Sequence, residues 1–176
     1  RQAHFDALTT LPNRLLFHQH LSDAVAHRRR HGGDLAVLFI DLDGFKAIND
    51  TLGHSVGDGV LRLVSARLAG CLRESDTLAR RGGDEFIAIL PDTGQRGASN
   101  VAQKLVDSLR LPLDAAGSEV LVTASVGVAM FPDNGHDRET LLKAADLAMY
   151  GAKEMGRDTH QLFSAALKED VERRVS

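Results

Sequence analysis

This chain has little cysteine, little net charge of either sign and no long hydrophobic run. Its single cysteine, Cys71, excludes an internal disulfide, and we expect a buried thiol in a reducing compartment. Lysine and arginine number 21 and aspartate and glutamate 24, so the net charge of −3 gives no electrostatic reason to expect nucleic-acid binding. No apolar run reaches the roughly 18 residues of a membrane-spanning helix, and we see no signal peptide. We therefore expect a cytoplasmic segment, whose parent protein could still be anchored in a membrane.

The pattern that is present indicates one ordinary globular domain. Of the 176 residues, 43% are hydrophobic, which is enough for one sizeable core. Predicted strands alternate with helices, so we expect an α/β (α+β) domain with a sheet of about five strands. The chain starts at Arg1, and we expect it to be cut from a longer protein. Residues 165–175 predict a charged amphipathic helix with no obvious partner, so we interpret 1–163 as the domain and 164–176 as a helical linker.

Residues 80–86, Arg-Arg-Gly-Gly-Asp-Glu-Phe, lie between two segments typical of short strands. Gly82 and Gly83 predict a type I′ hairpin turn, because both central positions of that turn need positive φ. Glycines also let a large anionic ligand approach the backbone closely. Adjacent residues on a strand point to opposite faces, so we expect Asp84 and Glu85 to do different jobs. For this stretch alone, the alternative is an exposed hairpin with a polar tip.

A second acidic stretch follows residues 35–40, an apolar run that predicts a central strand buried on both faces. The run leads into Asp41, Asp43 and a turn at Gly44 before a helix start, and carboxylates in that position suit a metal-bound phosphate. A calcium-binding EF-hand loop is excluded, since the residues at its fifth, sixth and twelfth positions do not fit. Helix capping remains an alternative for Asp43.

Other polar positions have structural as well as functional interpretations. Residues 53–59 predict a loop before a helix, with Ser55 as N-cap and Asp58 close to a capping-box position. Lys153 and Arg157 lie near the predicted end of a long helix. They could reach phosphates, or they could only complement the helix dipole.

Together these stretches resemble the GGDEF domain family, the diguanylate cyclases, over residues 4–163. One departure is Thr10, where the family usually has glycine, and we expect little functional cost from it. The matching blocks in chain order are 6–14 (Asp-Ala-Leu-Thr-Thr-Leu-Pro-Asn-Arg), 41–46 (Asp-Leu-Asp-Gly-Phe-Lys), 49–54 (Asn-Asp-Thr-Leu-Gly-His), 57–58 (Gly-Asp), 80–86 and 144–153 (Ala-Ala-Asp-Leu-Ala-Met-Tyr-Gly-Ala-Lys).

The resemblance implies a fold like the palm of nucleotidyl cyclases and polymerases, with a ferredoxin-like, mostly antiparallel sheet flanked by helices. It implies condensation of two GTP molecules into cyclic di-GMP with release of pyrophosphate, by two domains that meet in a two-fold dimer. In the parent protein it implies an upstream sensor and a possible downstream EAL phosphodiesterase domain as partners.

The same resemblance implies the metal ligands. Asp41 and Asp84, joined by the Leu42 carbonyl, would hold two Mg²⁺ (or Mn²⁺) ions per active site, and Mg²⁺ prefers such oxygen ligands. Glu85 would either assist deprotonation of the attacking 3′-hydroxyl or support the metal site. Asp84, Glu85 and Lys46 form the implied catalytic set.

The resemblance also implies three groups of GTP contacts. An aspartate that accepts from the N1 and exocyclic amino hydrogens of guanine selects GTP over ATP. The groups are the phosphate cradle Phe45, Lys46, Gly82 and Gly83, the cations Lys153 and Arg157 on the other side of the triphosphate, and the guanine readers Asn49 and Asp58.

Arg73 and Asp76 by themselves form part of a polar loop. Five residues separate Asp76 from Gly82, which is the family spacing of a product-inhibition site, and arginine suits bidentate guanine or phosphate contacts. We expect cyclic di-GMP to bind here and restrain the enzyme, with Lys104 as a weaker candidate partner.

Two other functions remain open. One is a GTP-binding regulatory module that controls an adjacent EAL phosphodiesterase domain. The other is a pure cyclic di-GMP receptor that acts through Arg73 and Asp76. Degenerate motifs would favour either, and the intact block at 82–86 favours an active cyclase.

Overall fold

A computed structural model of the chain describes residues 3–175; Arg1, Gln2 and Ser176 lie outside them. The helices are α1 (Arg14–His31), α2 (Phe45–Leu52), α3 (His54–Gly70), α4 (Gln95–Leu109), α5 (Arg138–Glu154) and α6 (Ala165–Val175). The strands are β1 (Leu35–Asp43), β2 (Thr77–Gly82), β3 (Glu85–Pro91), β4 (Leu113–Ala115), β5 (Ser118–Val120), β6 (Thr123–Phe131) and β7 (Thr159–Leu162).

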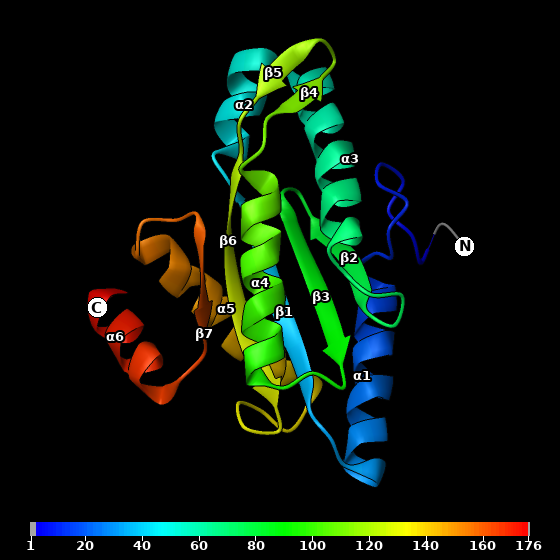
Figure 1. Cartoon of the computed structure of the whole chain (residues 1–176), viewed down its shortest axis with the longest axis vertical. Helices are drawn as coiled ribbons and strands as arrows, with labels where there is room; N and C mark the ends of the chain where they lie inside the picture. The colour runs from blue at the N-terminus through cyan, green and yellow to red at the C-terminus, as the bar shows by residue number, and fades with distance from the viewer. Residues whose placement is uncertain (1–2, 176) are drawn as a thin grey trace.

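Five strands form one sheet in the order β2-β3-β1-β6-β7. β1 pairs antiparallel with β3 and β6, and β2 pairs antiparallel with β3, whereas the edge strand β7 runs parallel to β6. The predicted sheet of about five mostly antiparallel strands is confirmed. The short hairpin β4-β5 forms a second sheet, at the end of the molecule where α2 lies (Figure 1).

Helices cover both faces of the sheet, with α4 in front of it and α5 behind it in the view of Figure 1. α3 and α4 pack on one face and α1 and α5 on the other. Side chains of β1 alternate between the two cores: Leu38 and Ile40 belong to the first, and Val37 and Phe39 to the second. The prediction that this strand is buried on both faces is confirmed, and it explains why the run is apolar without alternation.

The crossing of α5 over β6 depends on Gly127. A side-chain carbon at this position would collide with the backbone of Ala145 and Met149. The absence of a side chain therefore lets the helix approach the strand closely, which sets the height of α5 over the sheet and so the position of Lys153 near its end.

α3 begins at His54, inside the stretch 53–59 that was predicted to be a loop. Its N-cap is Gly53, with no side-chain cap bond, so the assignment of Ser55 as N-cap is wrong. Gly57 is buried where α3 meets α2. Packing between the two helices outweighs the low helix propensity of glycine here.

The C-terminal helix α6 packs against α5. Val171 is 2% exposed. Leu167 lies over Gly151, and a Cβ added to Gly151 would lie 2.9 Å from Cδ1 of Leu167. The expectation that this helix has no partner in the chain is wrong, because α5 offers it a glycine-containing face. In Figure 1 it lies at the edge of the molecule beside β7.

Two local expectations also change with the structure. Cys71 is half-buried at the C-cap of α3 and not fully buried. Thr10 has a φ of 64°, a left-handed conformation that favours glycine, which explains why glycine suits this turn.

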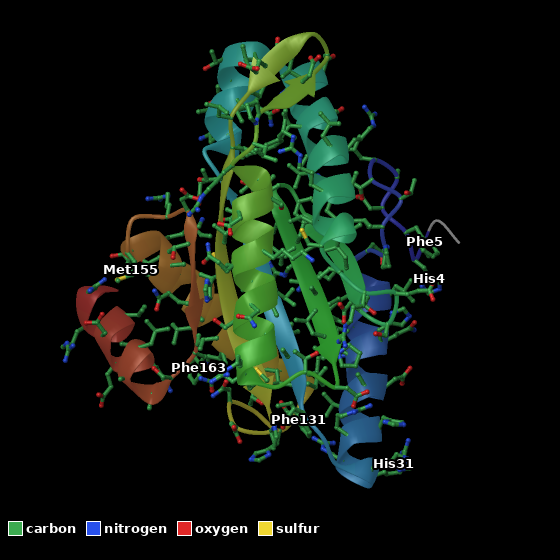
Figure 2. All side chains as sticks on the ribbon, in the orientation of Figure 1. His4, Phe5, His31, Phe131, Met155 and Phe163 are labelled. Carbon is green, nitrogen blue, oxygen red and sulfur yellow. The ribbon has the colours of Figure 1, made fainter. Side chains whose placement is uncertain are left out.

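The surface is ordinary for a globular domain. Side chains fill the space between the helices and the sheet, and exposed apolar groups such as Phe5 and Met155 lie at the periphery (Figure 2). Within the described residues, no helix has both the length and the apolar composition needed to cross a membrane.

Candidate active site

The end of β1 meets the tip of the β2-β3 hairpin. Asp41 is the antiparallel partner of Glu85, and the Leu42 N–H donates to the Asp84 carbonyl at 3.2 Å. The central turn positions are Gly83 and Asp84, since Gly82 pairs with Glu85. Only Gly83 of these two has positive φ, at 50°, whereas a type I′ turn needs positive φ at both positions. The predicted type I′ turn at Gly82 and Gly83 is therefore wrong in both its position and its type.

Asp41 is buried with its two oxygens in different surroundings. Oδ2 forms an ion pair with Nζ of Lys153 from the last turn of α5. Oδ1 is buried and accepts no hydrogen bond from any described residue. Buried polar atoms nearly always have a partner, so an unpaired carboxylate oxygen indicates a place for a cation or a donor from a ligand.

Asp84 adds a second carboxylate at the same point. Burial, together with the nearby charges of Asp41 and Glu85, raises the pKa of Asp84 to about 6. Asp84 lies in the turn and not in the strand, so the period-two alternation does not apply to it. Both Asp84 and Glu85 lie close to Asp41, and the expectation that they do different jobs stays a prediction.

Glu85 is held by an arginine that the sequence did not single out. Nη1 of Arg81 donates to Oε1 of Glu85 at 2.7 Å, and the Arg81 guanidinium lies 5.4 Å from the centre of the Phe39 ring. The stacking fixes the arginine, and the arginine fixes the carboxylate beside Asp41.

A cavity of about 910 Å³ opens from Asp41 and Glu85 toward α5 and α6. Burial raises the pKa of Asp146, with added contributions from Glu85 and Asp41 and opposing ones from Arg81 and Lys153. Sequence reasoning missed Asp146, although its spacing of seven from Lys153 places both on one face of a helix. The lining residues are Asp41, Glu85, Lys143, Asp146, Leu147, Met149, Tyr150, Lys153, Val171 and Glu172.

The two proposed guanine readers come from adjacent helices. Asn49 lies on α2, and its side chain occupies the place where a Cβ of Gly57 would be. Asp58 lies on the next helix, α3, and is exposed. Asp58 lies inside this helix, next to Gly57, and not in a loop before it.

Two of the predicted phosphate contacts, Phe45 and Lys46, lie at the start of α2. Gly44 is the N-cap of this helix, with φ 77° and no side-chain cap bond, so the capping alternative for Asp43 is wrong. Phe45 is buried in the core, whereas Lys46 is exposed. Phe45 therefore anchors the helix start by its ring, and Lys46 is available to a ligand.

Arg73 and Asp76 form a closed turn between α3 and β2. The Arg73 N–H donates to Oδ2 of Asp76 at 2.8 Å, and Nη2 donates to the Pro91 carbonyl and to Oγ1 of Thr93, both at 2.9 Å. The Asp76 side chain is 1% exposed and that of Arg73 57%. The turn thus presents the arginine to solvent. Lys104 is exposed on α4. Its backbone carbonyl accepts a weak hydrogen bond from Sγ of Cys71.

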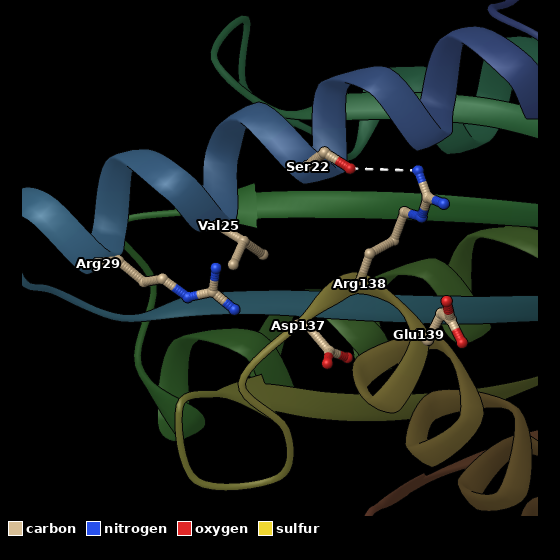
Figure 3. A pocket seen from close by; sticks show the side chains of 6 residues that line it. All are labelled: Ser22, Val25, Arg29, Asp137, Arg138 and Glu139. Atoms are coloured by element: carbon tan, nitrogen blue, oxygen red, sulfur yellow. Dashed lines mark hydrogen bonds between the residues drawn. The ribbon is translucent and has the colours of Figure 1, made fainter.

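A separate cavity of about 270 Å³ lies between α1 and the start of α5, and Figure 3 shows its side chains. Nη1 of Arg138 donates to Oγ of Ser22 at 3.2 Å, and Arg29 donates to the His136 carbonyl. The predicted site residues are absent from its lining, and its arginines already bond to protein oxygens. It is therefore separate from the carboxylate cluster.

Comparison with known proteins identifies the family. The family model "Diguanylate cyclase, GGDEF domain" matches residues 3–159. Diguanylate cyclase TpbB of Pseudomonas aeruginosa is 44% identical over 92% of this chain, which spans 38% of that protein. The bifunctional diguanylate cyclase/cyclic di-GMP phosphodiesterase MucR of the same species is 39% identical over 97% of this chain and 25% of that protein. The cyclic di-GMP phosphodiesterase NbdA is 41% identical over 95% of this chain and 21% of that protein. The chain therefore spans well under half of these relatives.

Solved structures agree with the sequence relatives. The GGDEF domain of TpbB (YfiN) from Pseudomonas aeruginosa superposes with a TM-score of 0.93 at 41% identity, covering 96% of this chain and 99% of that one. The coiled coil and GGDEF domain of DgcB from Caulobacter crescentus, solved with cyclic di-GMP, gives a TM-score of 0.84 at 28% identity over 92% of this chain and 86% of that one. The chain belongs to the GGDEF domain family, the diguanylate cyclases.

Proposed function

We propose that this domain condenses two GTP molecules into cyclic di-GMP and pyrophosphate. The observation that carries the proposal is the buried carboxylate of Asp41, which has one oxygen paired with Lys153 and the other without a hydrogen bond from the described residues, beside Asp84. Carboxylates placed so closely repel each other unless a cation lies between them. The neighbouring cations Lys153 and Arg81 suit a polyanionic substrate.

We propose that this site takes two divalent ions, and Mg²⁺ or Mn²⁺ is the natural choice because all candidate donors are oxygens. Asp41 and Asp84 would hold them, joined by the Leu42 carbonyl. When bound, the metal ions supply neutralisation of the triphosphate and a lower pKa for the attacking hydroxyl.

The chain's own residues orient the nucleotide. Gly82 and Gly83 let the backbone pass close to the α-phosphate, while Lys46 and Lys153 neutralise the outer phosphates from two sides. In each condensation, the 3′-oxygen of one GTP bonds to the α-phosphorus of the other, and the bond to the β-phosphate oxygen breaks so that pyrophosphate leaves. Glu85, held by Arg81, would receive the 3′-hydroxyl proton or support the metal ligands.

Asn49 and Asp58 would select guanine. Asp58 accepts hydrogen bonds only, so it matches the N1 and exocyclic amino hydrogens of guanine and has no match in the neutral adenine ring. Phe45 would contribute the backbone N–H at the start of α2 to the phosphate cradle, and Arg157 would neutralise the triphosphate from the other side.

One domain holds one GTP, so the reaction needs two copies face to face, as a two-fold dimer. We further propose that cyclic di-GMP binds at Arg73 and Asp76 and restrains that encounter. DgcB from Caulobacter crescentus, a structural neighbour, was solved with cyclic di-GMP, which supports a product site in this fold. Residues 164–176 would connect the domain to a downstream EAL domain, and an upstream sensor would control it.

A regulatory module is the second candidate. The relative named as a cyclic di-GMP phosphodiesterase is 41% identical to this chain, and that similarity favours a role in which GTP binding controls a neighbouring phosphodiesterase domain. The intact carboxylate cluster favours the cyclase.

The test is incubation of the purified domain with GTP and Mg²⁺ at several protein concentrations, with products identified by mass spectrometry. Cyclic di-GMP formation that rises faster than linearly with protein supports a dimeric cyclase. Asp84→Ala should abolish it, whereas Asp114→Ala, at an exposed acid on β4, should leave it unchanged. GTP binding without product, even after forced dimerisation, would favour the regulatory module instead.

A further inference from the structure

Asp43, the last residue of β1, links three separate parts of the chain through its carboxylate. Oδ2 accepts from Oγ1 of Thr123 at 2.7 Å and from the N–H of Asp158 at 3.0 Å. Oδ1 accepts from Oγ of Ser125 at 2.7 Å. Two of these donors lie on β6, and the third lies in the loop between α5 and β7.

This bonding separates Asp43 from its neighbour Asp41. Both oxygens of Asp43 accept hydrogen bonds from the protein, whereas Oδ1 of Asp41 accepts none from the described residues. Asp43 does not cap α2 either, since Gly44 takes that position. The carboxylate of Asp43 is therefore directed at the protein and not at a metal ion.

The loop that Asp43 holds has an unusual backbone. Gly156, Arg157 and Asp158 have φ values of 114°, 65° and 53°, so three consecutive residues lie on the left-handed side, two of them with side chains. Non-glycine residues adopt this conformation only when their surroundings impose it. Arg110 provides a second link, from Nε to Oδ1 of Asp158 at 3.0 Å and from Nη2 to its carbonyl at 3.2 Å.

We propose that Asp43 is a positioning residue for Arg157. The hydrogen bond from the Asp158 N–H fixes the backbone next to Arg157, and the exposed guanidinium is thereby aimed at the triphosphate before GTP arrives. Because the same carboxylate closes β1 two residues after Asp41, the two sides of the phosphate site are linked through one residue. The inference rests on the proposed role of Arg157 in GTP binding.

The test is a double-mutant cycle on GTP affinity with Asp43→Ala and Arg157→Ala, alone and combined. We expect each single variant to weaken GTP binding by roughly tenfold, as for loss of one charge-assisted contact. The double variant should be no weaker than Arg157→Ala, because a positioning residue has nothing left to position. Effects that multiply, to about a hundredfold, would overturn the proposal and indicate general destabilisation.

Matched variants separate positioning from packing. Thr123→Val removes the other hydrogen bond to Oδ2 but keeps the link to Asp158, so GTP affinity should change by less than about twofold. Asp43→Asn can present its amide oxygen to the Asp158 N–H and should restore most of the affinity lost in Asp43→Ala. An Asn variant as weak as the Ala variant would contradict the assigned hydrogen bond.

Two further outcomes are distinguishable. If Arg157→Ala binds GTP normally, its proposed role fails and the inference fails with it, whatever Asp43 does. If thermal unfolding shows that Asp43→Ala folds poorly, Asp43→Ser takes its place in the cycle, since serine keeps a polar side chain at this position but lacks the carboxylate that accepts from the Asp158 N–H. The GTP affinity of the double variant is then compared with that of Arg157→Ala in the same way.

Discussion

Lys153 and Asp41, from the end of α5 and the end of β1, form an ion pair that leaves the second oxygen of Asp41 buried and available. The two side chains are 28% and 6% exposed, so the pair is largely shielded from water. A buried carboxylate oxygen without a hydrogen-bond partner costs folding free energy. The same oxygen can serve as a ligand to a cation, including a metal ion bound to phosphate.

Lys153→Ala should therefore destabilise the metal-free domain. Removing one partner of a buried pair leaves an uncompensated charge on Asp41, and we expect a loss of about 2 kcal/mol in the free energy of unfolding. Urea unfolding in the presence of a chelator measures it, and Mg²⁺ should recover part of the loss. Lys168→Ala, at an exposed lysine of α6, is the control and should be neutral.

Asp84→Asn should stabilise the metal-free domain while abolishing catalysis. The folded-state pKa of about 6 lies above the ordinary value of 3.8, so between those two pH values the native state binds more protons than the unfolded state. The free energy of unfolding of the wild type therefore falls as the pH rises between these two pKa values. The variant should lack that loss and gain about 1 kcal/mol at pH 7, after allowance for solvent screening of a half-exposed group. A variant no more stable than the wild type in chelator would contradict the repulsion among the carboxylates.

Gly57→Ala should impair guanine recognition without unfolding the protein. A Cβ at this position would displace the Asn49 side chain, so we expect the KM for GTP to rise by roughly tenfold, as for a lost substrate hydrogen bond. Gly70 lies in the same helix with open space around its Cβ position. Gly70→Ala should leave KM unchanged and gain helix propensity, and an equal rise in KM in both variants would exclude the proposed contact.

Arg73→Ala should remove product binding and spare the fold. The turn is also held by the Arg73 N–H bond to Asp76, which the substitution keeps, so the loss in stability should stay under about 1 kcal/mol. Calorimetry with cyclic di-GMP should show lost affinity, and turnover should no longer slow as product accumulates. Arg62→Ala, at an exposed arginine of α3, is the matched control, and unchanged product affinity in Arg73→Ala would refute the inhibitory site.

Local patterns in the sequence identified the two segments that meet at the site. The apolar run before Asp41 predicted a strand buried on both faces, and the glycine pair before Asp84 predicted a hairpin. Both predictions were possible because strand burial and turn conformation depend on residues that are adjacent in the sequence. The resemblance across separated blocks then indicated the family, which the family match confirmed.

What the sequence could not determine was decided by contacts between distant residues. Gly57 of α3 packs against Asn49 of α2, and α6 packs with Leu167 over Gly151 of α5. The different surroundings of the Asp41 and Asp43 carboxylates, two residues apart on one strand, come from Lys153 and Asp158 near the far end of the chain. The spacing of residues in the sequence determines the period of a helix or strand. Whether a given carboxylate has hydrogen-bond partners depends on the donors that the folded chain brings close to it.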